Sequence, residues 1–342
     1  MMLSQNFESR LMLGVGFLLI GFPWFADWLD EPYLVSTASR IWIYALAAMS
    51  LNLLVGFAGL VSFGHSAYVG VGAYVVGILA WHQYEETNFL GLPGTLEGFI
   101  SIPFAMIVSG IVALGIGSLC LRTRGIYFIM ITLAFAQMLF YFFVSLEQYG
   151  GDDGLMMMAG RNKIPGLDLG EDRQMYWLSL VALGLVTWFL RRLSMSRFGM
   201  VLHALRQNET RLKAIGVPPY PYMLVAFVIA GALAGLSGAL LTNHMEFVSP
   251  DFLHWTRSGD LLIMVILGGI GTWTGPILGA IVFLLLEEFL PLLFQEIGLY
   301  LFSEHWRLVF GPLLICIVLF AKGGLHALVF KQMKGVHGAF AN

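Results

Sequence analysis

The sequence is too apolar and too poor in charge for a soluble domain. Of its 342 residues, 58% are hydrophobic and 11% are charged, and the mean hydropathy is +0.81, whereas soluble domains hold about 25% charged residues. The formal net charge of −3 gives no basic surface for nucleic acid. Apolar stretches follow one another with little sequence between them, which leaves no room for a sizeable soluble domain. The composition predicts an all-α, polytopic membrane protein with a single transmembrane domain over residues 1–342.

Apolar runs near the length that crosses a bilayer core of about 30 Å predict ten helices. They are expected at about 11–29, 41–60, 64–82, 99–121, 124–146, 175–190, 221–241, 258–270, 275–291 and 306–321. The first run ends in bulky residues where a signal-peptide cleavage site needs small ones, so we interpret it as a retained span. Cys120 and Cys316 lie inside apolar runs and are expected to be small buried side chains rather than disulfide partners or metal ligands.

The charged residues predict how the spans are oriented. Ten spans place both ends on one side, and that side holds 12 of the 18 basic residues but only Glu8 and Glu209 of the 21 acidic residues. Because cytoplasmic loops carry an excess of Lys and Arg, both termini are predicted to be cytoplasmic. Residues 147–174 then form the longest outer loop. This assignment leaves no carboxylate in the middle of a span and places Asp260 near the outer surface.

Two apolar segments, 41–82 and 258–291, are interrupted by glycine clusters. Each segment begins and ends outside and turns near the inner leaflet, and the clusters share a loose pattern of Gly-x-x-Gly followed by Ser or Thr and another Gly. Interrupted apolar segments at matching places in two halves of a chain are typical of transport pathways. We therefore expect broken helices, with candidate pathway and hinge residues Gly56, Gly59, Ser62, Gly64, His65, Ser66, Gly268, Gly271, Thr272, Thr274 and Gly275.

Some residues of these two segments are equally compatible with a purely structural role. Gly70, Gly72 and Gly77 precede an uninterrupted apolar run, and close helix packing accounts for them equally well. His65 and Asp260 are the ionisable groups nearest the two hairpins, and capping or solvation is the expected role of each.

A segment between the sixth and seventh spans has the pattern of an amphipathic helix over residues 201–215. Leu202, Leu205, Leu212 and Ile215 recur at helical spacing among polar and charged residues. Gly216 and the prolines that follow it end the helix. Such a helix either docks into a groove on a cytoplasmic partner or lies on anionic lipid, and composition favours neither.

Four long stretches carry a family resemblance. They read NLLVGFAGLVSFGHSAYVGVGAYVVG, LRTRGIYFIMITLAFAQM, ALRQNETRLKAIGV and VSPDFLHWTRSGDLLIMVILGGIGTWTGPILGA, and together they extend across most of residues 41–285. In this order they closely resemble the permease subunits of branched-chain amino acid ABC importers, of the LivM type.

The resemblance implies a set of partners in a bacterial inner membrane. They are a second permease of the LivH type, two cytoplasmic ATPase subunits that bind ATP and Mg, and a periplasmic binding protein that delivers an amino acid. Helix 201–215 would be the coupling helix, seated on the ATPase. The residues implied for this contact are Leu202, Leu205, Arg206, Asn208, Glu209, Leu212, Ile215 and Gly216. The family often places two small residues after the Glu of this helix, whereas Arg211 and Leu212 follow Glu209-Thr210 here.

The absence of nucleotide-binding, metal-binding and catalytic motifs is consistent with a permease subunit that relies on a separate ATPase. No Gly-Lys dipeptide occurs, so the chain cannot build a Walker A phosphate loop, and the free energy for transport is expected from another chain. No metal-ligand spacing or nucleophile motif appears, so we expect neither catalysis nor a cofactor in this chain. Two alternatives remain open: a permease for urea or short amides, and a secondary transporter or channel that works alone on an ion gradient.

Overall fold

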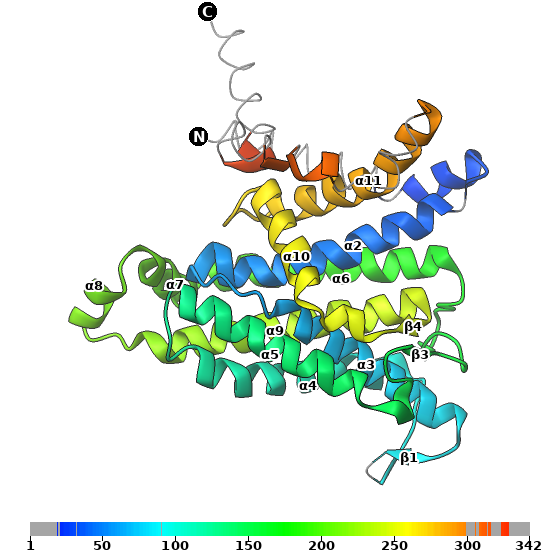
Figure 1. Ribbon diagram of the computed structural model, residues 1–342, viewed down its shortest axis with the longest axis horizontal. Coiled ribbons are helices and arrows are strands. Elements are labelled where there is room, and N and C mark those ends of the chain that lie inside the picture. Colours follow the sequence, from blue (N-terminus) through cyan, green and yellow to red (C-terminus); the bar gives the residue numbers. More distant parts are fainter. Residues whose placement is uncertain are drawn as a thin grey trace, which may run out of the picture.

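The computed structural model describes residues 19, 21–31, 33–89, 91–298, 305, 308–312, 314–315 and 323–327. Its long helices lie roughly along one direction of the molecule (Figure 1). Six of the described helices are long and apolar enough to cross a membrane, with α2 and η1 counted as one. The spans expected at 11–29 and 306–321, together with Cys316, lie partly or wholly outside the described residues, so the expected number of ten is not established.

Helices account for nearly all of the regular structure. In chain order they are α2 (Tyr33–Asn52), the π-helix η1 (Leu53–Ala58), α3 (His65–Tyr84), α4 (Gly98–Cys120), α5 (Ile126–Val144), the 3-10 helix η2 (Glu147–Tyr149), α6 (Asp172–Ser194), α7 (Arg197–Gln207), α8 (Glu209–Ala214), α9 (Pro219–Met245), the 3-10 helix η3 (Pro250–Leu253), α10 (Trp255–Gly268) and α11 (Gly275–Glu296). Two short antiparallel ribbons join them: β1 (Asn88–Phe89) pairs with β2 (Leu92–Pro93), and β3 (Leu155–Met156) pairs with β4 (Phe247–Val248).

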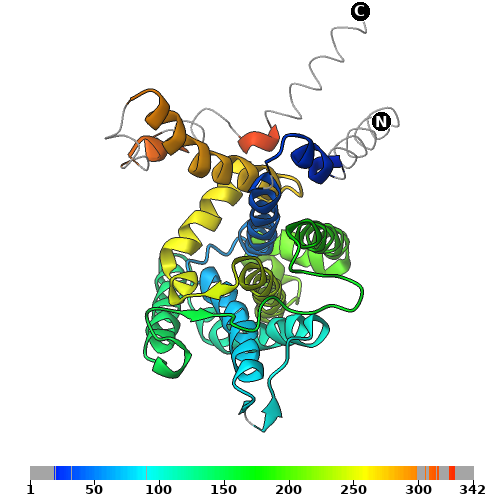
Figure 2. The ribbon, with the colours of Figure 1, turned by 90° about the vertical axis from the view of Figure 1, so that its right-hand side faces the viewer.

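Helix α2 and its continuation η1 form the centre of the bundle. In the apolar window of this span 94% of residues are buried, against 17% in the window of α5. Helix α2 contacts α6, α9, α10 and α11. A view along the bundle shows α10, in yellow, rising obliquely at one side of the bundle towards α11, in orange (Figure 2). The exposed apolar side chains of α4, α5 and α6 therefore suit a lipid-facing rim.

Helices α3 and α9 approach each other closely at glycines. A Cβ atom on Gly72 would lie 2.5 Å from the Cα of Gly235, and one on Gly238 would lie 2.9 Å from the nitrogen of Ala73. Helix α3 continues without a break through Gly70, Gly72 and Gly77. These three glycines therefore serve close packing and do not break the helix.

The two ends of the bundle differ in character. Helices α7 and α8 lie at one end, and the β3–β4 ribbon lies at the other (Figure 1). Residues 147–174 are held at the ribbon end by Arg161, whose guanidinium pairs with Asp172 at 2.9 Å and with Glu246 at 3.0 Å. We call the end with α7 and α8 the coupling end and the opposite one the ribbon end.

Candidate functional site

The first glycine cluster breaks the chain between two helices, as its sequence predicts. The π-helix η1 ends at Ala58 and is capped by Gly59, whose φ of 72° is a left-handed conformation that favours glycine. No regular helix forms again until α3 begins at His65. A π-helical turn is a common mark of a functional irregularity within a helix.

The second cluster makes a similar break between α10 and α11. Helix α10 ends at Gly268, and α11 begins at Gly275. Between them, Gly269 has a φ of 125° and Gly271 a φ of 77°. The hydroxyl of Thr272 donates to the carbonyl of Gly269 at 2.8 Å and accepts from the backbone N–H of Gly275 at 3.1 Å. Thr272 therefore satisfies two of the backbone groups that the break leaves free.

The two breaks, more than 200 residues apart in sequence, are bound together by Asn52. Its Oδ1 accepts from the N–H of Gly271 at 2.9 Å, and its Nδ2 donates to the carbonyl of Thr272 at 2.9 Å. Beside these hydrogen bonds, a Cβ atom on Gly56 would lie 2.7 Å from the Cα of Gly271, so the two backbones touch. Sequence reasoning missed Asn52, although an asparagine inside an apolar run is a signal for such a role.

Arg206 of α7 connects the coupling end to both breaks. Its Nη1 donates to the carbonyl of Gly56, and the same nitrogen would lie 3.0 Å from a Cβ atom on Gly271. Nearby, the ring of Phe57 stacks on that of Trp273 with centroids 4.6 Å apart. We call Asn52, Gly56, Arg206, Gly271 and Thr272 the junction.

The segment formed by α7 and α8, residues 197–214, which we call the coupling segment, differs from the continuous helix expected over 201–215. It forms two helices, α7 and α8, because Asn208 is extended (φ −163°, ψ 100°) and its side chain caps α8 by accepting from the N–H of Arg211 at 2.9 Å. Asparagine competes with the helix backbone in this way, and it is a favoured N-cap residue. The expectation of one uninterrupted helix was wrong at this residue.

The break also divides the apolar residues of the segment between two environments. Leu202, Leu205 and Leu212 are buried against the rest of the chain, whereas Ile215 is 71% exposed. Glu209 pairs with Lys213 at 3.0 Å and with Arg124 of the α4–α5 turn at 2.5 Å. The leucines and Glu209 thus fix the segment to the bundle, while Ile215, next to Gly216, faces outward.

A cavity of about 260 Å³ lies beneath the coupling segment. It is bounded by the chain that follows the first break, by the α4–α5 turn and by Leu205, Arg206 and Glu209. The first glycine break, the α4–α5 turn and the coupling segment therefore line one concave site at the coupling end.

The remaining candidates of the first cluster are packed inside the chain. Ser62, His65 and Ser66 are fully buried; His65 Nε2 lies 2.7 Å from the Ser50 hydroxyl, and the Ser66 N–H donates to the Ser258 hydroxyl at 2.8 Å. In the second cluster, Thr274 Oγ1 lies 2.8 Å from His326 Nδ1. A Cβ atom on Gly64 would clash with the carbonyl of Thr132 in α5. These residues do not line an open route in this conformation.

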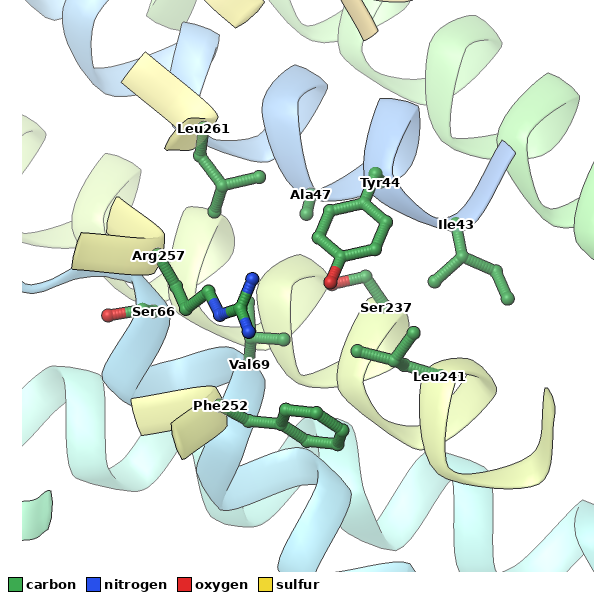
Figure 3. A pocket seen from close by; sticks show the side chains of 10 residues that line it. All are labelled: Ile43, Tyr44, Ala47, Ser66, Val69, Ser237, Leu241, Phe252, Arg257 and Leu261. Carbon is green, nitrogen blue, oxygen red and sulfur yellow. The ribbon is translucent and has the colours of Figure 1, made fainter. Parts of the chain in front are cut away.

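A second hollow lies deeper in the bundle, between α2, α3, α9 and α10. Figure 3 shows the guanidinium of Arg257 and the hydroxyl of Tyr44 directed into it. Arg257 pairs with Asp251 at 2.6 Å and lies 4.0 Å from Asp260. Tyr44 of the same hollow lies near the middle of the α2–η1 span, so the carboxylates paired with Arg257 lie nearer to mid-span than the position near the outer surface that was expected for Asp260.

Among the described residues, no group of three His, Cys, Asp or Glu side chains is placed to hold a metal ion.

A helical bundle with broken helices, whose breaks touch a polar segment at one end, defines a membrane permease. The chain matches over residues 33–318 the family described as the permease component of the branched-chain amino acid transport system. It belongs to that family.

Named relatives agree with this assignment. The chain is 27% identical to the high-affinity branched-chain amino acid transport system permease protein LivM of Escherichia coli, over 98% of this chain and 79% of the relative. It is 24% identical to a probable LivM permease of Methanocaldococcus jannaschii, over 83% and 90%. With LivH of Salmonella typhimurium the identity is 23%, over 82% and 90%. No solved structure matches.

Proposed function

We propose that this chain is the permease subunit of an ABC importer that carries branched-chain, hydrophobic amino acids across the bacterial inner membrane. Its partners would be a LivH-type permease, two cytoplasmic ATPase subunits that bind ATP and Mg, and a periplasmic binding protein. Both termini and the coupling end would face the cytoplasm. The names of the relatives support the solute class and the pairing of two permeases.

The observation that carries this proposal is the contact of Arg206 with both helix breaks. An ATPase that moves the coupling segment would change the position of one side chain that touches Gly56 and lies against Gly271. Since ATP shifts a conformational equilibrium only by favouring one state, the segment must differ between ATPase states. The junction would pass that difference to α2 and α10 together, because Asn52 ties their ends.

The test is uptake by the reconstituted complex. Liposomes containing both permeases and the ATPases, with binding protein outside and ATP inside, are expected to accumulate leucine and to ignore urea and acetamide. Liposomes with the ATPases omitted, or with ADP in place of ATP, should accumulate nothing. Uptake of urea in preference to leucine would support the amide permease instead.

A stand-alone secondary transporter is favoured by one observation, the carboxylates of Asp251 and Asp260 beside Arg257 within the bundle. It predicts that this chain alone, in liposomes with an imposed proton or sodium gradient, accumulates leucine without nucleotide. That result would overturn the proposed ABC function.

A further inference from the structure

The ion pairs of Arg257 lie beside the middle of the α2–η1 span. Tyr44, which lines the same hollow, is 14 residues before the end of η1 and 11 residues after the start of α2. At 1.5 Å per residue this is about 20 Å from one end of the span and about 16 Å from the other. Arg257 stands in the first turn of α10, a helix of only 14 residues that lies between the two ends of the bundle (Figure 1).

The three charged side chains are open to the outside of the chain at this depth. Their side-chain exposures are 32% for Arg257, 55% for Asp251 and 36% for Asp260. Charged groups within the hydrocarbon region face water or protein rather than lipid, and they mark solute and ion pathways. This face of α10 is therefore directed towards water or another subunit.

The chemistry of the cluster suits a zwitterion. One guanidinium and two carboxylates carry a formal net charge of −1, so a simple anion would be repelled, whereas an α-amino acid offers one group of each sign. Arg257 can bind a carboxylate in a planar, two-point fashion, and the aspartates can receive an ammonium group. Phe252 and Leu261 supply apolar surface beside these charges, which fits a hydrophobic side chain.

We propose that Arg257, Asp251 and Asp260 form a binding site within the membrane for the carboxylate and ammonium groups of the transported amino acid. This inference rests on the proposed function and places the solute in it. The hollow has a volume of about 20 Å³, room for about one water molecule. The site must therefore widen to admit the solute, and Gly269, at the end of α10, offers a joint for that movement.

The test compares Arg257→Gln with Arg40→Gln in the complete reconstituted importer. Arg40 is a matched control because it too is partly exposed, at 28%, and pairs with two carboxylates, those of Glu287 and Glu288. Arg257→Gln is expected to lower the maximal rate of leucine uptake roughly tenfold or more, with KM unchanged because the binding protein sets it. Arg257→Lys should restore part of the rate, and Arg40→Gln should keep it.

Each outcome of this comparison decides for or against the site. Wild-type uptake by Arg257→Gln overturns the inference and leaves the proposed function standing, whereas a wild-type complex that carries no leucine overturns both. An equal loss in both variants also overturns the inference, because it would reflect a general effect of breaking an ion pair.

A second measurement covers the case in which Arg257→Gln fails to assemble. Leu261→Cys is made with Cys120→Ala and Cys316→Ala, and the complex is treated with a charged, membrane-impermeant thiol reagent. Reaction in at least one nucleotide state, slowed several-fold by leucine with binding protein, is expected. If no nucleotide state allows reaction, the hollow is not on an aqueous pathway and the inference fails.

Discussion

Asn52 shows how a single buried amide can hold two broken helices together. Each break frees backbone groups that lipid cannot satisfy, and an unpaired polar group in hydrocarbon costs several kcal/mol. The side chain of Asn52 supplies one acceptor and one donor, and both meet the loop between α10 and α11. Its position four residues before Gly56 places it on the same side of the helix as the close backbone contact.

Asn52→Ala is expected to uncouple ATP hydrolysis from transport. The substitution leaves Gly271 N–H and Thr272 C=O without their partner, which should lower the free energy of unfolding by about 1–3 kcal/mol and free the two breaks to move separately. ATP hydrolysis by the reconstituted complex should persist while leucine uptake per ATP falls about tenfold or more.

Asn243→Ala is the matched control for Asn52→Ala. Asn243 is also fully buried, accepts from the N–H of Asn162 at 2.8 Å and donates to the carbonyl of Ala239 at 2.8 Å, but it lies at the ribbon end. It should lose similar stability and keep the wild-type ratio of leucine to ATP. An Asn52→Ala complex that also keeps this ratio would remove the junction from the coupling route.

At the scale of elements, the coupling segment has one face that belongs to this chain and another that is free for a partner. Leu212 is 4% exposed and Ile215 is 71% exposed. Leu212→Ala should therefore lower the free energy of unfolding by about 2–4 kcal/mol, because it opens a cavity. Ile215→Asp should leave the melting temperature of the isolated chain unchanged and reduce co-purification of the ATPases about tenfold or more.

Leu167→Asp is the control for Ile215→Asp, since Leu167 is an exposed leucine in the 147–174 loop at the other end. It should retain the ATPases at wild-type stoichiometry. Full retention by Ile215→Asp would instead favour the interpretation that α8 lies on lipid.

The sequence predicted the breaks in the helices but not what holds them. Gly59 and Gly271 need positive φ values, and this requirement is visible in the choice of glycine. Asn52 and Arg206 meet these glycines only through contacts between residues at least 65 positions apart in sequence, which a local pattern does not encode. The short length of helix α10 was evident from the sequence, whereas its placement in the bundle depends on η3, which packs against α3 and α5.

At the scale of the whole molecule, the distribution of charge and the position of the junction have to agree. The basic residues Arg124, Arg206 and Lys213 cluster at the coupling end, where Glu209 pairs with two of the three. If this end faces the cytoplasm, the excess of Lys and Arg obeys the positive-inside rule, and α8 lies where ATP is available. In the opposite orientation the excess of Lys and Arg would lie outside, against the positive-inside rule. A partner driven by cytoplasmic ATP could then not reach Arg206.

Two methionines allow this orientation to be measured. Met158 in the 147–174 loop and Met195 at the end of α6 are 67% and 66% exposed, so Met158→Cys and Met195→Cys, each with Cys120→Ala and Cys316→Ala, present equally accessible thiols. In intact spheroplasts an impermeant maleimide should label Met158→Cys at least tenfold faster than Met195→Cys, and detergent should equalise them because only the membrane separates the two sites. Faster labelling of Met195→Cys before permeabilisation would invert the chain and place the coupling segment outside, where an ATPase could not drive it.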